Sequence, residues 1–261
     1  MAAKAKDWDP RIVSFCCNWC SYAGADLAGV SRVQISPNFR IVRIMCSGRM
    51  DPELAVRLLR EGMDGVLVLG CHPGDCHYIE GNYFAEIKME WTRNLLAKTE
   101  FGAERLKLDW VSASEDQRFA QIVGDFQDTI QELGPNPINE RGNKAMRDEL
   151  DAALLTLSDF RLRALMGKVR TIRDDGNVYG EVKKRSELDE LVRNAVESEF
   201  TRNHILVLAK EREMTVPMLA EKVHRDPENV MTQVVRLRQK NLLGLARIEG
   251  LDPYYTTIGG I

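Results

Sequence analysis

The sequence predicts an α/β protein: a small four-stranded parallel sheet with flanking helices, followed by an α-helical and winged-helix-like C-terminal region. Over the first 137 residues, β-prone runs alternate with segments of helical periodicity, which is the order of elements that builds a parallel sheet covered by helices. After a Pro-rich stretch at residues 134–137, the chain becomes charged and Leu-rich with helical spacing. Prolines at alternate positions end a helix and mark a linker.

The composition is that of a globular protein without an unusual charge. The 261 residues are 44% apolar and carry a formal net charge of −3, so ordinary hydrophobic cores can form. Residues 1–8 lack the apolar core of a signal peptide, and no stretch approaches the roughly 18 apolar residues of a spanning helix. We therefore expect a soluble, cytoplasmic protein with no membrane partner.

Two βα units come first in the predicted sheet. Residues 11–16 form a strand and residues 21–30 a helix, and residues 39–46 form a second strand. Asp51 is suited to cap the next helix, with Pro52 at its first position. The residues expected on the buried face of that helix are Leu54, Leu58 and Leu59.

Two more units complete the sheet. Residues 64–70 are predicted as the third strand and are apolar after Asp64, as expected for a strand covered on both faces, and a helix is predicted at 83–98. Residues 106–111 form the fourth strand. Residues 114–117 have the form of a capping box, and the helix after them runs to about Leu133. This order predicts a flavodoxin-like sheet.

The C-terminal half reads as helices followed by a hairpin. Helices are predicted within 142–173 and at 187–200, 203–213, 216–223 and 226–240, with a β-hairpin over 242–258. Three helices and a hairpin in about the last 60 residues are the order of elements of a winged helix. We therefore predict three domains: an α/β domain at 1–137, a helical connector at 138–200 and a winged-helix-like domain at 201–261.

Six cysteines lie within the first 76 residues. Three of them, Cys17, Cys46 and Cys71, sit at the ends of predicted strands, and Cys20 and Cys76 follow three and five residues later. Ligands on open parallel sheets bind beyond the carboxyl ends of the strands. We therefore expect five thiols to converge at one edge of the sheet, and in a reducing compartment such a cluster indicates metal or redox chemistry.

Four interpretations of the thiols stay open from residue types alone. They are an iron–sulfur cluster, a structural zinc site, a dithiol site at Cys17 and Cys20 between a strand and a helix, and buried cysteines acting as small hydrophobes. Zinc ribbons usually place their cysteine pairs on hairpin knuckles, whereas these cysteines follow parallel strands. The placement therefore favours iron.

Other side chains near the thiols have two interpretations each. His72 and His77 could ligate iron or donate hydrogen bonds to sulfur, or they are histidines of a surface loop. Trp19 could shield the site from water or simply pack. Arg49 could offset the negative charge of a thiolate centre, or be a solvated surface charge.

At these residues the chain resembles a known family. The segments FCCNWCSYAGAD (15–26), RIMCSGR (43–49) and GCHPGDCHY (70–78), followed by GNY (81–83) and WVSASE (110–115), are similar to the delta subunit of methyl-viologen-reducing hydrogenase. The resemblance covers residues 8–137 and not the C-terminal half. Cys16 falls outside the five-cysteine pattern of the family, which matches Cys17, Cys20, Cys46, Cys71 and Cys76.

The resemblance implies a non-catalytic subunit that carries a [2Fe–2S] cluster. Such a subunit passes electrons between a partner oxidoreductase, of the hydrogenase or formate dehydrogenase type, and the flavin-containing subunit of a heterodisulfide reductase-type complex, within a hetero-oligomer. We expect the ligands to be two pairs, Cys17/Cys20 and Cys71/Cys76, with Cys46 an alternative ligand or a near neighbour. Bond-making chemistry would belong to the partners.

The alternative function is a metal- or redox-sensing winged-helix transcriptional regulator with a four-cysteine metal site. The basic residues available on the last helix and the hairpin are Arg236, Arg238, Lys240 and Arg247. Without a basic stripe, we favour protein docking over nucleic-acid binding for this module. The sequence has no Gly-x-Gly-x-x-Gly and no phosphate loop, so we expect no second cofactor.

Overall fold

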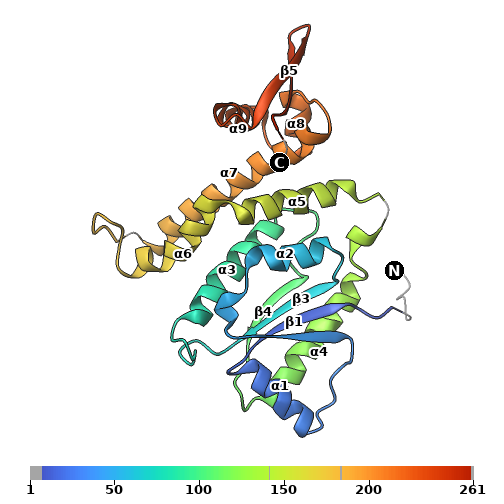
Figure 1. Cartoon of the computed structure of the whole chain (residues 1–261), viewed down its shortest axis with the longest axis vertical. Helices are drawn as coiled ribbons and strands as arrows, with labels where there is room; N and C mark the ends of the chain where they lie inside the picture. Colours follow the sequence, from blue (N-terminus) through green and yellow to red (C-terminus); the bar gives the residue numbers. More distant parts are fainter. Residues whose placement is uncertain (1–7, 141, 183, 260–261) are drawn as a thin grey trace. The chain divides into compact units, whose positions relative to one another are not determined.

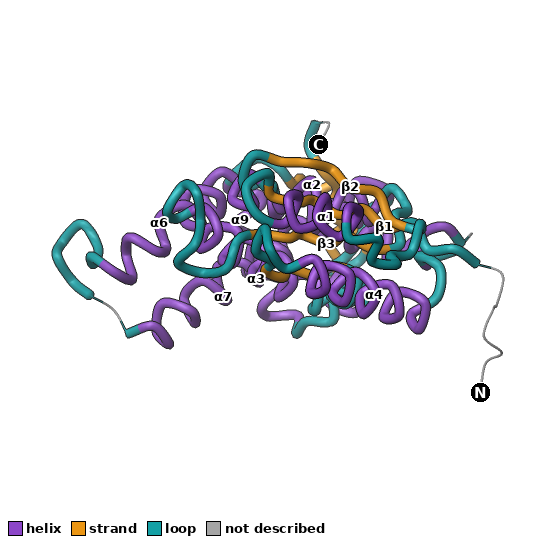
Figure 2. Tube along the Cα trace, turned by 90° about the horizontal axis from the view of Figure 1, so that it is seen from below, coloured by secondary structure: helices purple, strands orange, loops and turns teal. Residues whose placement is uncertain are grey.

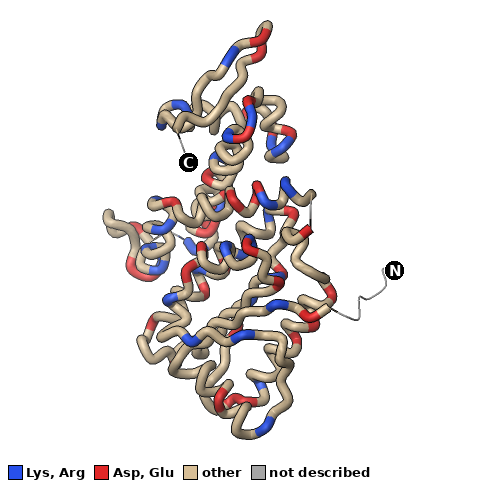
Figure 3. Tube along the Cα trace, turned by 45° about the vertical axis from the view of Figure 1, so that its right-hand side comes forward, with Lys and Arg blue, Asp and Glu red and all other residues tan. Residues whose placement is uncertain are grey.

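The structure, a computed structural model, describes residues 8–140, 142–182 and 184–259. Residues 1–7, on which the expectation that the chain has no signal peptide was based, lie outside the described residues. The chain divides into two compact units, residues 1–143 and 144–261 (Figure 1), and the finer division into three domains stays a prediction. None of the described helices is long and apolar enough to cross a membrane. Basic and acidic residues are interspersed along both units (Figure 3).

The first unit is built on a four-stranded parallel sheet, as predicted. Its strands are β1 (Ile12–Cys17), β2 (Phe39–Ile44), β3 (Gly65–Gly70) and β4 (Leu106–Trp110), in the order β2-β1-β3-β4. This is the flavodoxin-like order, in which the chain starts at a central strand. Every residue of β1 and β3 is buried, because these central strands are covered on both faces.

Four helices alternate with the strands along the chain, and Figure 2 draws the helices in purple and the strands in orange. The helices are α1 (Ser21–Val30), α2 (Pro52–Arg60), α3 (Gly81–Leu96) and α4 (Asp116–Leu133). Helices α1 and α4 contact each other on one face of the sheet, and α2 contacts α3 on the other (Figure 1). Ile12 and Leu67 on the strands pack with Phe119 and Phe126 of α4 in the main core.

Two local predictions about helices are wrong. Leu59 lies on the buried face of α2 as predicted, but Leu54 is 41% exposed, and Pro52, Ala55 and Val56 complete the buried face. Helix α4 has Glu115 at its N-cap and no side-chain capping bond, so the expected capping box does not form. The Glu115 carboxylate accepts hydrogen bonds from the Ser112 backbone and the His72 ring instead.

A buried polar network joins the chain at the N-terminal ends of the strands. Asp64, just before β3, accepts hydrogen bonds from the backbone N–H groups of Arg11 (2.7 Å) and Asn136 (2.8 Å). The Arg105 guanidinium donates to the carbonyls of Asp64 and Gly134, each at 3.0 Å. This network lies at the edge opposite the one that carries the cysteines.

Replacing Asn136 with alanine should lower the free energy of unfolding of the first unit by about 3 kcal/mol. The buried amide of Asn136 donates to the carbonyls of Leu59 and Met63 and accepts from the Ile138 N–H, so the variant removes three hydrogen bonds to the backbone at once. Urea unfolding followed by tryptophan fluorescence measures the loss. The matched control Asn38→Ala removes only an exposed bond and should cost less than about 0.5 kcal/mol; equal losses in the two variants would contradict the argument.

The second unit is helical with a terminal hairpin. Its elements are α5 (Lys144–Ser158), α6 (Phe160–Asp174), α7 (Arg185–Glu211), α8 (Val216–Lys222), α9 (Pro227–Gln239), β5 (Leu243–Glu249) and β6 (Asp252–Thr257). The order of the last elements matches the prediction, and Met214 bridges to Tyr255 of the hairpin. The winged-helix assignment itself stays a prediction.

The two helices predicted at 187–200 and 203–213 are a single helix, α7. The expected break between residues 200 and 203 does not occur, because the side chains of Thr201 and Arg202 form bonds within the helix. The Thr201 hydroxyl donates to the Glu197 carbonyl at 2.9 Å, and the Arg202 guanidinium pairs with Glu199 one turn earlier. These contacts let polar residues continue a helix that is buried around this point.

Acid should destabilise the second unit through His204. Burial lowers the pKa of His204 to about 4, with His224 adding to the effect. The unfolded chain takes up this proton near pH 6.5 and the folded chain does not, so the free energy of unfolding falls as the pH drops through this window. From pH 7 to pH 5 we expect a loss of about 2 kcal/mol, measured as lower protection factors of the α7 amides, each calculated against the intrinsic exchange rate at the same pH. A His204→Gln variant should lose this dependence, and an unchanged slope would refute it.

Candidate metal centre

Five cysteines lie at the carboxyl edge of the sheet, where the topology predicts them. Cys17 is the last residue of β1, Cys20 is the N-cap of α1, and Cys71 directly follows β3. Cys46 follows β2 and caps the short 3-10 helix η1 (Ser47–Arg49). Cys76 lies in the loop between β3 and α3.

Three of these thiols form a tight group. The Sγ atoms of Cys17, Cys20 and Cys71 all lie within 4.8 Å of one another, and the Cys17 and Cys71 sulfurs are 3.7 Å apart. All three residues are at least 95% buried. This is the donor set of a soft metal or cluster.

The other two thiols form a pair. The sulfurs of Cys46 and Cys76 are 3.9 Å apart, and the Cys46 sulfur accepts the Gly48 N–H at 3.4 Å. The sequence interpretation paired Cys71 with Cys76, whereas here Cys71 groups with Cys17 and Cys20. Which four of the five sulfurs bind a metal stays a prediction.

Cys16 belongs to the hydrophobic core. Because side chains alternate along a strand, Cys16 packs in the cluster with Leu69 and Phe119, while Cys17 joins the thiol group. Burial raises the pKa of the Cys16 thiol to about 11. Its sulfur lies 3.4 Å from the Ser14 hydroxyl.

Hydrogen bonding within the thiol group shifts the pKa values of its three members in opposite directions. The neighbouring Cys20 and Cys71 thiols lower the pKa of Cys17 well below its usual value. The same contacts with Cys17 raise the pKa of Cys20 and of Cys71. Metal binding here must therefore release protons, which makes it dependent on pH.

Backbone groups approach the sulfurs closely. The N–H groups of Trp19 and Ser47 bond the Cys17 sulfur, and that of His77 bonds the Cys71 sulfur. Such donors stabilise negative charge on sulfur. Gly81 lies directly against the Cys46/Cys76 pair, because a Cβ placed there would lie 2.3 Å from the Cys46 sulfur and 3.3 Å from the Cys76 sulfur.

The ring of each histidine in the loop contacts another side chain: His72 contacts Glu115 and His77 contacts Trp19. The His72 Nε2 lies 2.7 Å from a Glu115 carboxylate oxygen, and the bonds from Ser112 and His72 lower the pKa of Glu115. The His77 ring stacks on Trp19, with ring centres 3.7 Å apart and planes 11° apart. Trp19 is 43% exposed, so it lies at the rim of the site.

Arg49 is exposed at the surface of the structure. Asn82, in contrast, contributes to the site although the sequence analysis did not single it out. Asn82 is buried in the first turn of α3, and its amide donates to the carbonyls of Cys71 (3.3 Å) and His72 (2.7 Å). It thereby fixes the start of the cysteine loop. The sequence shows only an asparagine beside a glycine, and it takes the structure to show that this asparagine is buried and bonded to the cysteine loop.

Comparisons with known proteins agree with this arrangement. The family described as "Methyl-viologen-reducing hydrogenase, delta subunit" matches residues 12–134. The vhc iron-sulfur subunit of the F420-non-reducing hydrogenase of Methanococcus voltae is 45% identical over 140 residues, which cover 54% of this chain and 97% of that protein.

The chain belongs to this delta-subunit family. A second relative, the iron-sulfur subunit of the F420-non-reducing hydrogenase of Archaeoglobus profundus, is 46% identical over 131 residues, covering 50% of this chain and 96% of that protein. One subunit of the ferredoxin/F(420)H(2)-dependent CoB-CoM heterodisulfide reductase of Methanosarcina acetivorans is 42% identical over 134 residues, which are 51% of this chain and 17% of that protein. The delta-subunit match lies entirely within the first unit, and the resemblance found in the sequence is confirmed.

Proposed function

We propose that this chain is an electron-transfer subunit that holds a [2Fe–2S] cluster at the carboxyl edge of its sheet. The observation that carries the proposal is the convergence of thiols from separate strand ends, with the Cys17, Cys20 and Cys71 sulfurs within 4.8 Å of one another. A [2Fe–2S] cluster takes four cysteine thiolates. The proposed ligands are Cys17, Cys20, Cys71 and Cys76, with Cys46 beside Cys76 as a neighbour or alternative ligand.

The residues present fit such a group. Zinc accepts the same four thiolates, but the relatives that cover this unit are named iron-sulfur subunits, which favours iron. A bound [2Fe–2S] cluster supplies one-electron chemistry. Burial of the cysteines excludes water from the sulfurs, and the N–H bonds from Trp19, Ser47 and His77 stabilise their negative charge, a combination that tunes the reduction potential.

The proposed partners are an electron-donating and an electron-accepting protein in a hetero-oligomer. The heterodisulfide reductase relative from Methanosarcina acetivorans carries a segment similar to this one within a much longer chain. The presence of this segment in one polypeptide of such a reductase supports a flavin-containing heterodisulfide reductase-type partner. The relatives named as iron-sulfur subunits of hydrogenases support a hydrogenase-type partner, and a formate dehydrogenase-type partner would serve the same role.

Metal analysis of the anaerobically purified chain tests the proposal. We expect about two irons and two sulfides per chain and a brown colour that bleaches with dithionite. Iron, sulfide and zinc are measured on the same sample, and electron paramagnetic resonance of the reduced protein identifies the type of cluster. A colourless protein that holds zinc would overturn the electron-transfer proposal and favour the metal-sensing regulator.

A further inference from the structure

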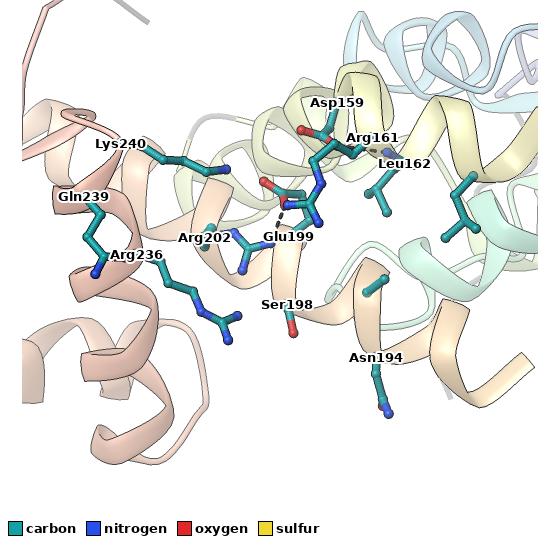
Figure 4. Close-up of a pocket in the computed structure, with 12 residues that line it drawn as sticks. Asp159, Arg161, Leu162, Asn194, Ser198, Glu199, Arg202, Arg236, Gln239 and Lys240 are labelled. Atoms are coloured by element: carbon teal, nitrogen blue, oxygen red, sulfur yellow. Dashed lines mark hydrogen bonds and ion pairs between the residues drawn. The ribbon is translucent and has the colours of Figure 1, made fainter. Parts of the chain in front are cut away.

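The second unit contains a cavity of about 710 Å³ between α6, α7 and α9. Four of its lining residues are cationic: Arg161 at the start of α6, Arg202 on α7, and Arg236 and Lys240 at the end of α9 (Figure 4). They come from three different helices, α6, α7 and α9. Their convergence on one cavity calls for a physical explanation.

Three of the four cations have no acidic partner in the part of the chain that the structure describes. Among the residues that the structure describes, Arg161, Arg236 and Lys240 form no ion pair. Like charges that face a shared space repel one another, and an anion between them removes the repulsion. The cavity is therefore electrostatically suited to a negatively charged ligand.

The fourth cation is buried and only partly satisfied. Arg202 is 7% exposed. Its guanidinium pairs with Glu199 and donates to the Gln233 side chain at 2.7 Å, while its buried Nε has no hydrogen-bond partner among the described residues. A buried donor without an acceptor is unfavourable. An anion in the cavity would place acceptor oxygens near the Arg202 guanidinium and so would favour its burial.

The acidic residues of the lining are already engaged. The Asp159 carboxylate caps α6 by accepting the Leu162 N–H at 2.9 Å, and Glu199 pairs with Arg202. Four cations against these two carboxylates leave the lining with an excess of two positive charges. A phosphate monoester carries a matching charge of about −1.5 to −2 at neutral pH.

The size and the remaining surface indicate a small organic phosphate. A volume of about 710 Å³ lies within the range of ligand pockets. Leu162, Leu165 and Ala195 supply an apolar wall, and Asn194, Ser198 and Gln239 supply neutral polar groups. We propose that this cavity binds a phosphate monoester of mononucleotide size, independently of the thiol site in the first unit.

The same charges argue against nucleic acid as the ligand. Arg247, the basic residue of the hairpin, is neutralised by Glu213 at 2.7 Å and Glu249 at 2.5 Å. Arg238 lies over the Tyr255 ring, and Arg236 and Lys240 line the cavity instead. An extended phosphate backbone would therefore meet no continuous basic surface on this module.

Titration calorimetry with AMP on the full chain, at constant ionic strength, tests the proposal. Arg236→Gln removes a lining charge, whereas Arg238→Gln removes the same charge from the same helix outside the cavity. We expect saturable binding of AMP, weakened at least about 10-fold by Arg236→Gln and by Arg161→Gln, since each removes a charge-assisted contact. Arg238→Gln should stay within about twofold of the unaltered chain, and adenosine, which lacks the phosphate, should not bind.

Several outcomes would overturn the inference. These are no saturable AMP binding at millimolar concentration, equal effects of Arg236→Gln and Arg238→Gln, or adenosine binding as well as AMP. Tight binding of a DNA duplex that AMP cannot displace would assign the basic residues to nucleic acid instead. Arg161 and Arg236 are exposed, so the variants should fold, and equal thermal unfolding of all variants verifies this.

Discussion

A Cys17→Ser variant should lose more than about 100-fold in affinity for iron, because removal of a direct ligand must exceed the 10- to 100-fold cost of losing a group that only supports a ligand. The Cys17 sulfur lies at the centre of the proposed site, 3.7 Å from the Cys71 sulfur and bonded by two backbone N–H groups. Iron and sulfide content after anaerobic purification, together with the visible spectrum, measures the loss. Cys20→Ser and Cys71→Ser should behave in the same way.

Cys16→Ala is the matched control for this experiment. Cys16 is the adjacent residue and is equally buried, but it lies in the hydrophobic core on the α4 side of the sheet. Its replacement should leave the iron content unchanged and cost about 1 kcal/mol of stability through lost packing. If Cys16→Ala lost iron as completely as Cys17→Ser, the proposed division of the two cysteines between core and metal site would be wrong.

Gly81→Ala should lower cluster content about 10-fold without removing any thiol, an effect of the size seen when the surroundings of a metal ligand are disturbed. The added methyl group would lie 2.3 Å from the Cys46 sulfur and 3.3 Å from the Cys76 sulfur, so both sulfurs would have to move. Iron content and the spectrum of the reduced protein report the change. Because Gly81 is the first residue of α3 and its φ is not positive, alanine fits its backbone.

Gly29→Ala provides the comparison. Gly29 is also helical, and a Cβ there meets no atom within 4 Å, so this variant should keep its cluster and gain up to about 1 kcal/mol from helix propensity. Normal iron content in Gly81→Ala would show that the Cys46/Cys76 pair lies outside the cofactor site. The cluster would then need its fourth ligand from elsewhere, which would also contradict the assignment of Cys76.

The sheet was predictable because its signals are local and agree with one another. The run after Asp64, residues 65–70, is apolar without interruption. These residues form β3, which is buried at every position. Parallel strands then require their carboxyl ends to meet, so the convergence of Cys17 and Cys71 followed from topology alone. Cys16 was correctly placed outside the thiol group, and the structure gives the reason, since neighbouring residues of a strand face opposite sides.

Other features depend on contacts that the sequence does not show. Ser114 and Gln117 have the spacing of a capping box, but Glu115 takes the N-cap position and its carboxylate bonds Ser112 and His72. The grouping of Cys71 with Cys17 rather than Cys76 depends on where the loop turns, which Asn82 fixes. The basic cavity of the second unit has no motif, because its cations come from three helices.

The polar network of the first unit affects what should happen to the fold when a cofactor is lost. Asp64, Arg105 and Asn136 tie the chain together at one end of the strands, and the cysteines occupy the other end. Loss of a cofactor from the cysteine edge would leave these hydrogen bonds at the opposite edge in place. The chain without its cofactor should therefore keep its fold and be able to take up iron and sulfide again.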